Sequence, residues 1–191
     1  MKIYGLAGSN GAGKDSLAEM LVERHKFYFA IATDMLRDEL ENRGLPTDRV
    51  HKAQLSAEWR RKYGMAAIVD RALEEYEQVQ DQYDGLIVGS LRHPGEVDRI
   101  HKLGGQVIWV DADPKLRYDR LQNNDRGRIE DRKSFDEFMA DEAREMHPEG
   151  DEATLNVSAV KAKADIFIEN NGNDIAAFKD EAEKSLGFVS E

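Results

Sequence analysis

Short apolar runs alternate with amphipathic segments along the chain, which is the pattern of helices that connect parallel strands in one sheet. After the first run, Leu17, Met20 and Leu21 recur at helical spacing. The continuous apolar runs predict buried strands at residues 3–7, 27–32, 86–88, 107–110 and 166–168. The pattern therefore predicts the α/β fold class, with a five-stranded parallel sheet and helices on both faces.

Polar signals indicate where helices begin and where a loop separates them. Thr33 and Asp34 are expected to cap a helix, and a long helical region follows in residues 48–82. Residues 122–133 are polar with little periodicity, so we expect a loop between two helices there. At 191 residues the chain fits one domain, 1–191, and a second core domain is not expected.

Composition and charge exclude several classes of function. The net charge of −11 argues against a broad nucleic-acid surface, because such surfaces are basic. The chain has no cysteine, and its five histidines lack metal-ligand spacing, so neither disulfides nor structural zinc are expected. No apolar run approaches the ~20 residues that span a bilayer, and the first residues are too short a run for a signal peptide. We expect a cytoplasmic protein without nucleic-acid or membrane partners.

A glycine-rich loop lies between the first predicted strand and the helix that follows it. It matches the Walker A pattern, in which backbone N–H groups cradle phosphates and a lysine reaches the β- and γ-phosphates. A tight glycine turn is the alternative, and a dinucleotide fingerprint fits worse because the glycines have another spacing. The sequence thus predicts a P-loop NTPase. The expected nucleotide-binding residues are Gly8, Ser9, Asn10, Gly11, Ala12, Gly13, Lys14, Asp15 and Ser16.

The residue after the P-loop lysine is unusual. Asp15 stands where a serine or threonine usually binds Mg²⁺. Its carboxylate is either a ligand of Mg²⁺, directly or through water, or only a favourable charge in the first helical turn. The predicted strand 86–88 ends at Gly89, so the acid that often holds the metal at a neighbouring strand end is missing. We therefore expect ATP and Mg²⁺ as cofactors, with Asp15 as the metal residue.

Three further segments resemble the nucleoside monophosphate kinase-like P-loop proteins, especially dephospho-CoA kinases and archaeal adenylate kinase-like proteins. Residues 33–37, Thr-Asp-Met-Leu-Arg, look like the adenylate kinase segment Thr-Gly-Asp-Met-Leu-Arg without its glycine. Residues 90–97 are similar to the Gly-Ile-Arg…Glu-Val stretch of the archaeal group, and residues 164–172 resemble a dephospho-CoA kinase segment beside the adenine of ATP. The resemblance implies a nucleotide-kinase fold with an acceptor-binding helical segment at 33–82.

The resemblance also assigns roles to individual residues. It implies that Arg37 and Arg92 bind the acceptor phosphate, that Asn171 and Gly172 lie beside adenine, and that Arg117 assists catalysis. Asp34 either accepts a hydroxyl proton or caps its helix. The loop 122–133 resembles a small lid whose arginines neutralise charge on the transferred phosphoryl group, as Lys14 does. The lid candidates are Arg126 and Arg128, with Arg132 as a third. Each arginine has the alternative of a surface charge or helix pair.

Together these features predict an ATP- and Mg²⁺-dependent phosphotransferase whose partner is a small phosphorylated acceptor. The favoured acceptor is a nucleoside or deoxynucleoside monophosphate, and dephospho-CoA is the alternative. A nucleotide-dependent switch or ATPase without a small acceptor is the competing class. The acceptor's base and sugar, the choice between ATP and GTP, and the oligomeric state stay open.

Overall fold

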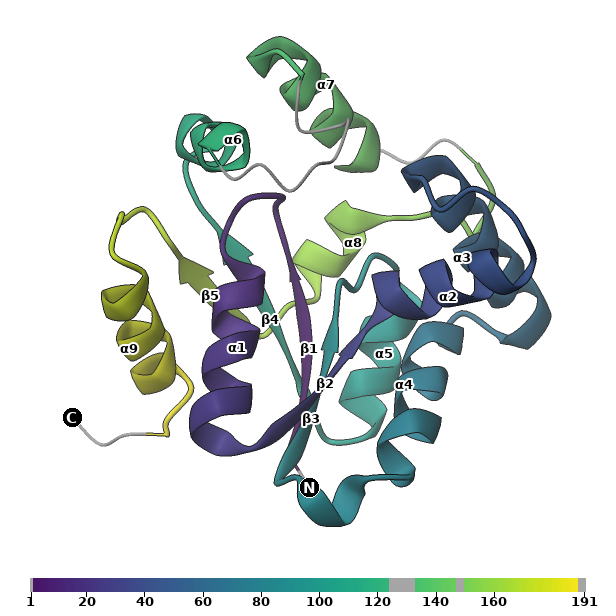
Figure 1. The fold of residues 1–191 in the computed structure, drawn as a ribbon, viewed down its shortest axis with the longest axis horizontal. Coiled ribbons are helices and arrows are strands. Elements are labelled where there is room, and N and C mark those ends of the chain that lie inside the picture. Colours follow the sequence, from purple (N-terminus) through teal and green to yellow (C-terminus); the bar gives the residue numbers. More distant parts are fainter. Residues whose placement is uncertain (1, 124–132, 147–149, 189–191) are drawn as a thin grey trace.

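A five-stranded, all-parallel sheet forms the centre of the protein, which we describe from a computed structural model (Figure 1). The structure describes residues 2–123, 133–146 and 150–188. In sheet order, the strands are β2 (Phe27–Ile31), β3 (Gly85–Gly89), β1 (Lys2–Gly8), β4 (Gln106–Asp111) and β5 (Ile166–Glu169). The predicted α/β class and the parallel sheet are confirmed.

Helices cover both faces of the sheet because alternate strand residues point to opposite sides. Leu86 and Val88 pack toward α2, α3, α4, α5 and α8, whereas Ile87 packs toward α1 and α9. The bounds are α1 (Lys14–His25), α2 (Ala32–Asn42), α3 (Arg49–Tyr63), α4 (Ala67–Glu77), η1 (Gln80–Gln82), α5 (Pro94–Lys102), α6 (Pro114–Asn123), α7 (Phe135–Met146), α8 (Val157–Ala162) and α9 (Ile175–Ser185). Within the described ranges, no helix is long and apolar enough to cross a membrane.

One expectation about helices needs correction, and one helix was not predicted. Helix α2 begins at Ala32, directly after β2, and Ile31 is its N-cap residue, so Thr33 and Asp34 lie inside the first turn rather than capping it. Helix α8 was not predicted, because six residues are too few to show a helical period. The long helical region is confirmed as α3 and α4, which separate at Gly64 with a φ of 103°.

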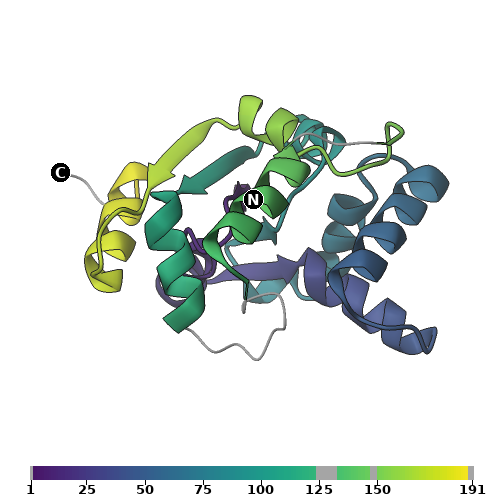
Figure 2. The same ribbon diagram turned by 90° about the horizontal axis from the view of Figure 1, so that it is seen from above.

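The order of the strands places the candidate site at the carboxyl edge of the sheet. Strand β1 pairs with β3 on one side and β4 on the other, so its last residues lie between the ends of both. Helices α6 and α7 lie beyond this edge, and in the view from above α7 crosses over the strand ends (Figure 2). Open parallel sheets bind ligands at this edge.

A buried ion pair joins α3 to α5 behind the site. Arg60 and Glu96 are 2% and 1% exposed, and Arg60 Nη2 donates to Glu96 Oε1 at 2.7 Å. Arg60 also donates to the carbonyl oxygen of Ala153, and the second oxygen of Glu96 accepts from the backbone N–H groups of Arg92 and His93. The ion pair thus joins three segments that are distant in sequence: α3, residues 92–96 and the segment at Ala153.

Replacing Glu96 by alanine should lower the free energy of unfolding by about 3–5 kcal/mol, because the Arg60 charge stays buried without its partner. Denaturant unfolding followed by circular dichroism measures this change. Glu77→Ala, at an exposed position on α4, is the control and should stay within about 0.5 kcal/mol. A loss of stability in Glu96→Ala no larger than in this control would contradict the assigned role of the pair.

Candidate active site

The loop that follows β1 has the backbone shape of a phosphate cradle. Gly8, Gly11 and Gly13 have φ values of 140°, 78° and 101°, in the region that favours glycine. A Cβ at Gly8 would lie 2.0 Å from the carbonyl oxygen of Val110 on the neighbouring strand, so no side chain fits there. The sequence pattern and this geometry agree that the loop must turn sharply beside β4.

Lys14 lies over the start of this loop. Its Nζ donates to the carbonyl oxygens of Gly8 at 3.0 Å and Ser9 at 2.7 Å. Helix α1 begins at Lys14, and among the described residues no side chain caps its N-terminus. The lysine charge and the N-terminal N–H groups of the helix therefore act on the same small volume, which favours an anion.

The carboxylate beside the loop is Asp111, at the end of β4, which the sequence analysis missed. Burial raises its pKa, but hydrogen bonds from the Ser9 hydroxyl, Trp109, the Ala112 N–H and Lys161 outweigh burial and hold the pKa below its usual value. These donors occupy the carboxylate. Asp111 therefore fixes the position of Ser9.

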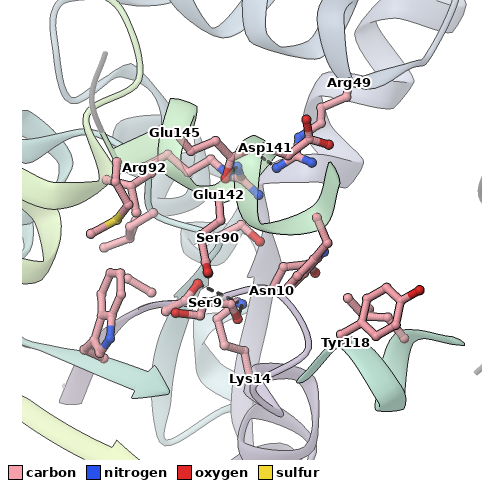
Figure 3. A pocket seen from close by; sticks show the side chains of 18 of the residues that line it. Ser9, Asn10, Lys14, Arg49, Ser90, Arg92, Tyr118, Asp141, Glu142 and Glu145 are labelled. Atoms are coloured by element: carbon pink, nitrogen blue, oxygen red, sulfur yellow. Dashed lines mark hydrogen bonds and ion pairs between the residues drawn. The ribbon is translucent and has the colours of Figure 1, made fainter. Parts of the chain in front are cut away.

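The expected gap at the end of β3 has a steric cause. A Cβ at Gly89 would lie 2.5 Å from the Phe29 ring, so an acidic side chain there requires the ring to move. Ser90 follows with a φ of 64° and lines the cavity near Ser9 and Lys14 (Figure 3). Asp15 is exposed in the first turn of α1. Within the described residues no cluster of three His, Cys, Asp or Glu side chains could hold a metal alone.

A cavity extends from the phosphate loop to α7, and two arginines line its far end. Arg92 is the predicted acceptor residue, and Arg49, at the start of α3, is an additional one. Both contact Glu145 of α7, with Arg92 Nη1 at 3.0 Å from its Oε2 (Figure 3). Partial burial, together with the Arg49 charge, lowers the pKa of Arg92, whose side chain is 37% exposed, but Arg92 is still protonated at neutral pH.

Arg117 connects the phosphate loop to α7. It is 3% exposed, donates to the carbonyl oxygens of Ala112 at 2.8 Å and Asn10 at 3.3 Å, and forms a bidentate pair with Glu142 at 2.6 and 2.9 Å. Its guanidinium is therefore committed to positioning the loop and the helix. A direct catalytic role of Arg117 stays a prediction.

The remaining predicted residues divide into three groups. Asp34 and Arg37 pair with each other at 2.9 Å, are about half exposed, and are not part of the cavity lining. The turn containing Asn171 and Gly172 lies beside the loop, because the preceding Asn170 donates to the Ala12 carbonyl oxygen at 2.9 Å. The lid arginines lie outside the described residues; these are Arg126, Arg128 and Arg132.

The fold and the loop define a P-loop protein of the kinase-like type. Solved structures with this fold include TT1252 from Thermus thermophilus, with a TM-score of 0.59, 18% identity and coverage of 99% of this chain and 98% of that one. Shikimate kinase from Bacteroides thetaiotaomicron also has a TM-score of 0.59, at 14% identity, with 98% of each chain covered. The predicted P-loop kinase-like fold is confirmed.

Residues 5–147 match the AAA domain family, and the chain belongs to this family. Curated relatives include UPF0200 proteins from Methanococcus maripaludis and Pyrobaculum aerophilum. The protein from Methanococcus maripaludis is 26% identical, with 91% of this chain and 90% of the relative covered. The protein from Pyrobaculum aerophilum is 27% identical, with 99% and 97% covered. The finer resemblance to dephospho-CoA kinases stays a prediction.

His93 holds the segment that carries Arg92. It is 5% exposed, its Nδ1 accepts from the Gly95 N–H at 3.0 Å, and its Nε2 donates to the Glu152 carbonyl oxygen at 2.7 Å. The Nδ1 contact requires an unprotonated nitrogen. Burial accordingly lowers the pKa of His93.

This lowered pKa predicts a stability that depends on pH. Above the unfolded-state pKa of about 6.5 both states are neutral at His93. As pH falls below that value the unfolded state binds the proton first, so stability decreases by up to about 1.4 kcal/mol per pH unit until the folded-state pKa is reached. His93→Asn, which retains a helix cap, should show a smaller decrease in denaturant unfolding between pH 7 and 5. Equal slopes for both proteins would refute this.

Proposed function

We propose that the protein is an ATP- and Mg²⁺-dependent phosphotransferase that acts on a nucleoside or deoxynucleoside monophosphate. The observation that carries the proposal is that Lys14 of the phosphate loop and the arginine pair Arg49 and Arg92 line one cavity. A cavity with cationic groups at both ends suits two phosphorylated substrates in line with each other. The net charge of −11 supports a small acceptor rather than a nucleic acid.

In this proposal the donor nucleotide lies on the loop. The backbone N–H groups and Lys14 hold its β- and γ-phosphates, and the turn at Asn171 and Gly172 lies on its base side. We assign Mg²⁺ to Asp15, because it is an exposed carboxylate directly after the P-loop lysine and carboxylate oxygens are ligands that Mg²⁺ prefers. Mg²⁺ would neutralise charge on the phosphates during transfer.

The reaction needs positioning more than acid–base chemistry. An acceptor phosphate is already ionised at neutral pH, so it attacks without a general base. Arg92 and Arg49 align it, and Arg117 holds the loop through Asn10. We assign Arg126 and Arg128 to the transferred group as lid arginines that also exclude water.

A coupled ADP-release assay over a panel of nucleoside and deoxynucleoside monophosphates tests the proposal. At least one acceptor should stimulate turnover above the water background. Lys14→Ala should reduce that turnover by about 10²–10³-fold, because the lysine charge that stabilises the transition state is removed. Lys102→Ala, at an exposed position on α5, is the matched control and should retain activity.

The same assay separates the alternatives. If dephospho-CoA alone stimulates turnover, the acceptor is dephospho-CoA and not a nucleoside monophosphate. Slow hydrolysis that no acceptor changes, and that Arg92→Gln leaves unaltered, would refute the kinase and favour a nucleotide-dependent switch.

The metal role of Asp15 has its own test. Asp15→Asn should weaken Mg²⁺ affinity in the presence of ADP by about tenfold or more, because a charged oxygen ligand is replaced by a neutral one. Isothermal titration with MgCl₂ measures the affinity. Glu19→Gln, one turn later on α1, is the control and should not change it. Equal affinity in Asp15→Asn and the unmodified protein would limit Asp15 to a favourable charge in the first helical turn.

A further inference from the structure

One carboxylate of α7 lies between the two arginines at the acceptor end of the cavity. Glu145 contacts Arg49 through Oε1 and Arg92 through Oε2, so each of its oxygens accepts from a different guanidinium (Figure 3). The three residues come from the start of α3, the segment after β3 and the end of α7. Glu145 is thus placed as a bound anion would be.

The neighbouring acidic side chains have other partners. Glu142 pairs with Arg117, Asp141 pairs with Lys133 and Arg144, and Glu96 pairs with Arg60. Asp141 acts on Arg49 and Glu96 acts on Arg92 at longer range. In direct contact, however, the two guanidiniums of Arg49 and Arg92 share the one carboxylate of Glu145.

We propose that Arg49 and Arg92 form a binding site for a phosphate monoester dianion, and that Glu145 occupies this site until the dianion displaces it. The inference rests on the proposed function, since it assigns the acceptor's phosphate to this site. It adds Arg49 as a binding residue and Glu145 as an internal competitor.

The competitor determines which anion binds. Glu145 is part of the chain, so its effective concentration at the arginines is high, and a ligand with one carboxylate offers nothing that Glu145 lacks. A phosphate dianion carries twice the charge and three oxygens, which match two guanidinium forks. Selectivity for phosphate monoesters over carboxylates follows from this difference.

Binding of inorganic phosphate to the full chain tests the proposal. The chain is saturated with ADP and Mg²⁺ so that the phosphate loop is occupied, and phosphate is titrated by calorimetry at a pH where it is a dianion. Glu145→Gln should bind phosphate about tenfold more tightly than the unmodified protein, because the site is no longer self-occupied. Glu145→Gln should also bind acetate more tightly. The double variant Arg49→Gln with Glu145→Gln should not show this tighter binding of phosphate.

Asp136→Asn is the matched control, because it removes one negative charge from an exposed position on the same helix. It should leave phosphate binding unchanged. Equal or weaker phosphate binding by Glu145→Gln overturns the proposal, and so does an equal gain in Asp136→Asn. Glu145→Ala serves as a second variant that removes the carboxylate.

The result for the anion site can be distinguished from the result for the proposed kinase activity. The titrations are repeated on a Lys14→Ala background without ADP, so that they do not depend on nucleotide binding. If phosphate binding responds to Glu145 as expected but no nucleotide is phosphorylated, the anion site stands and the kinase assignment fails. If a nucleotide is phosphorylated but Glu145→Gln binds phosphate no more tightly, the kinase stands and the competitor does not.

Discussion

The carboxylate of Glu96 determines the geometry of the cavity end that holds Arg49 and Arg92. It binds the buried Arg60 of α3 and the N–H groups of Arg92 and His93 in the segment before α5. Helix α3 also carries Arg49, and that segment carries Arg92. The spacing of the two arginines in the cavity therefore depends on an interaction behind them. A buried charge pair of this kind contributes more to the unique arrangement of segments than to net stability.

The phosphate-loop end of the cavity is held by a different set of contacts. The loop bonds to β4 through the Ser9 N–H and the Val110 carbonyl oxygen at 3.1 Å, and Asn170 after β5 donates to the loop at Ala12. These contacts come from strand pairing and from turns at the sheet edge. The phosphate-loop end is thus held mainly by contacts at the sheet edge, with Arg117 as an added helix contact, whereas the arginine end depends on helices and ion pairs alone.

This difference explains what the sequence predicts and what it does not. The strands and the loop are encoded locally, in apolar runs such as 86–88 and in glycines with fixed spacing, so both were predicted. Arg49 and Glu145 are charged residues on amphipathic helices, where a surface charge is the ordinary expectation. Only the tertiary structure brings them together. Arg37 was assigned by resemblance, and its pairing with Asp34 depends on where α2 begins.

Helix α7 carries two carboxylates one turn apart that contact opposite ends of the cavity. Glu142 binds Arg117, which contacts the phosphate loop at Asn10, and Glu145 binds the arginine pair. A rigid helix cannot tilt at one end without moving the other. Under the proposed function, release of Glu145 by an acceptor would therefore also shift the Glu142 contact with Arg117. If that shift changes the affinity for the donor nucleotide, thermodynamic reciprocity requires the donor to change the affinity for the acceptor by the same factor. One helix face would then link the two ends of the cavity.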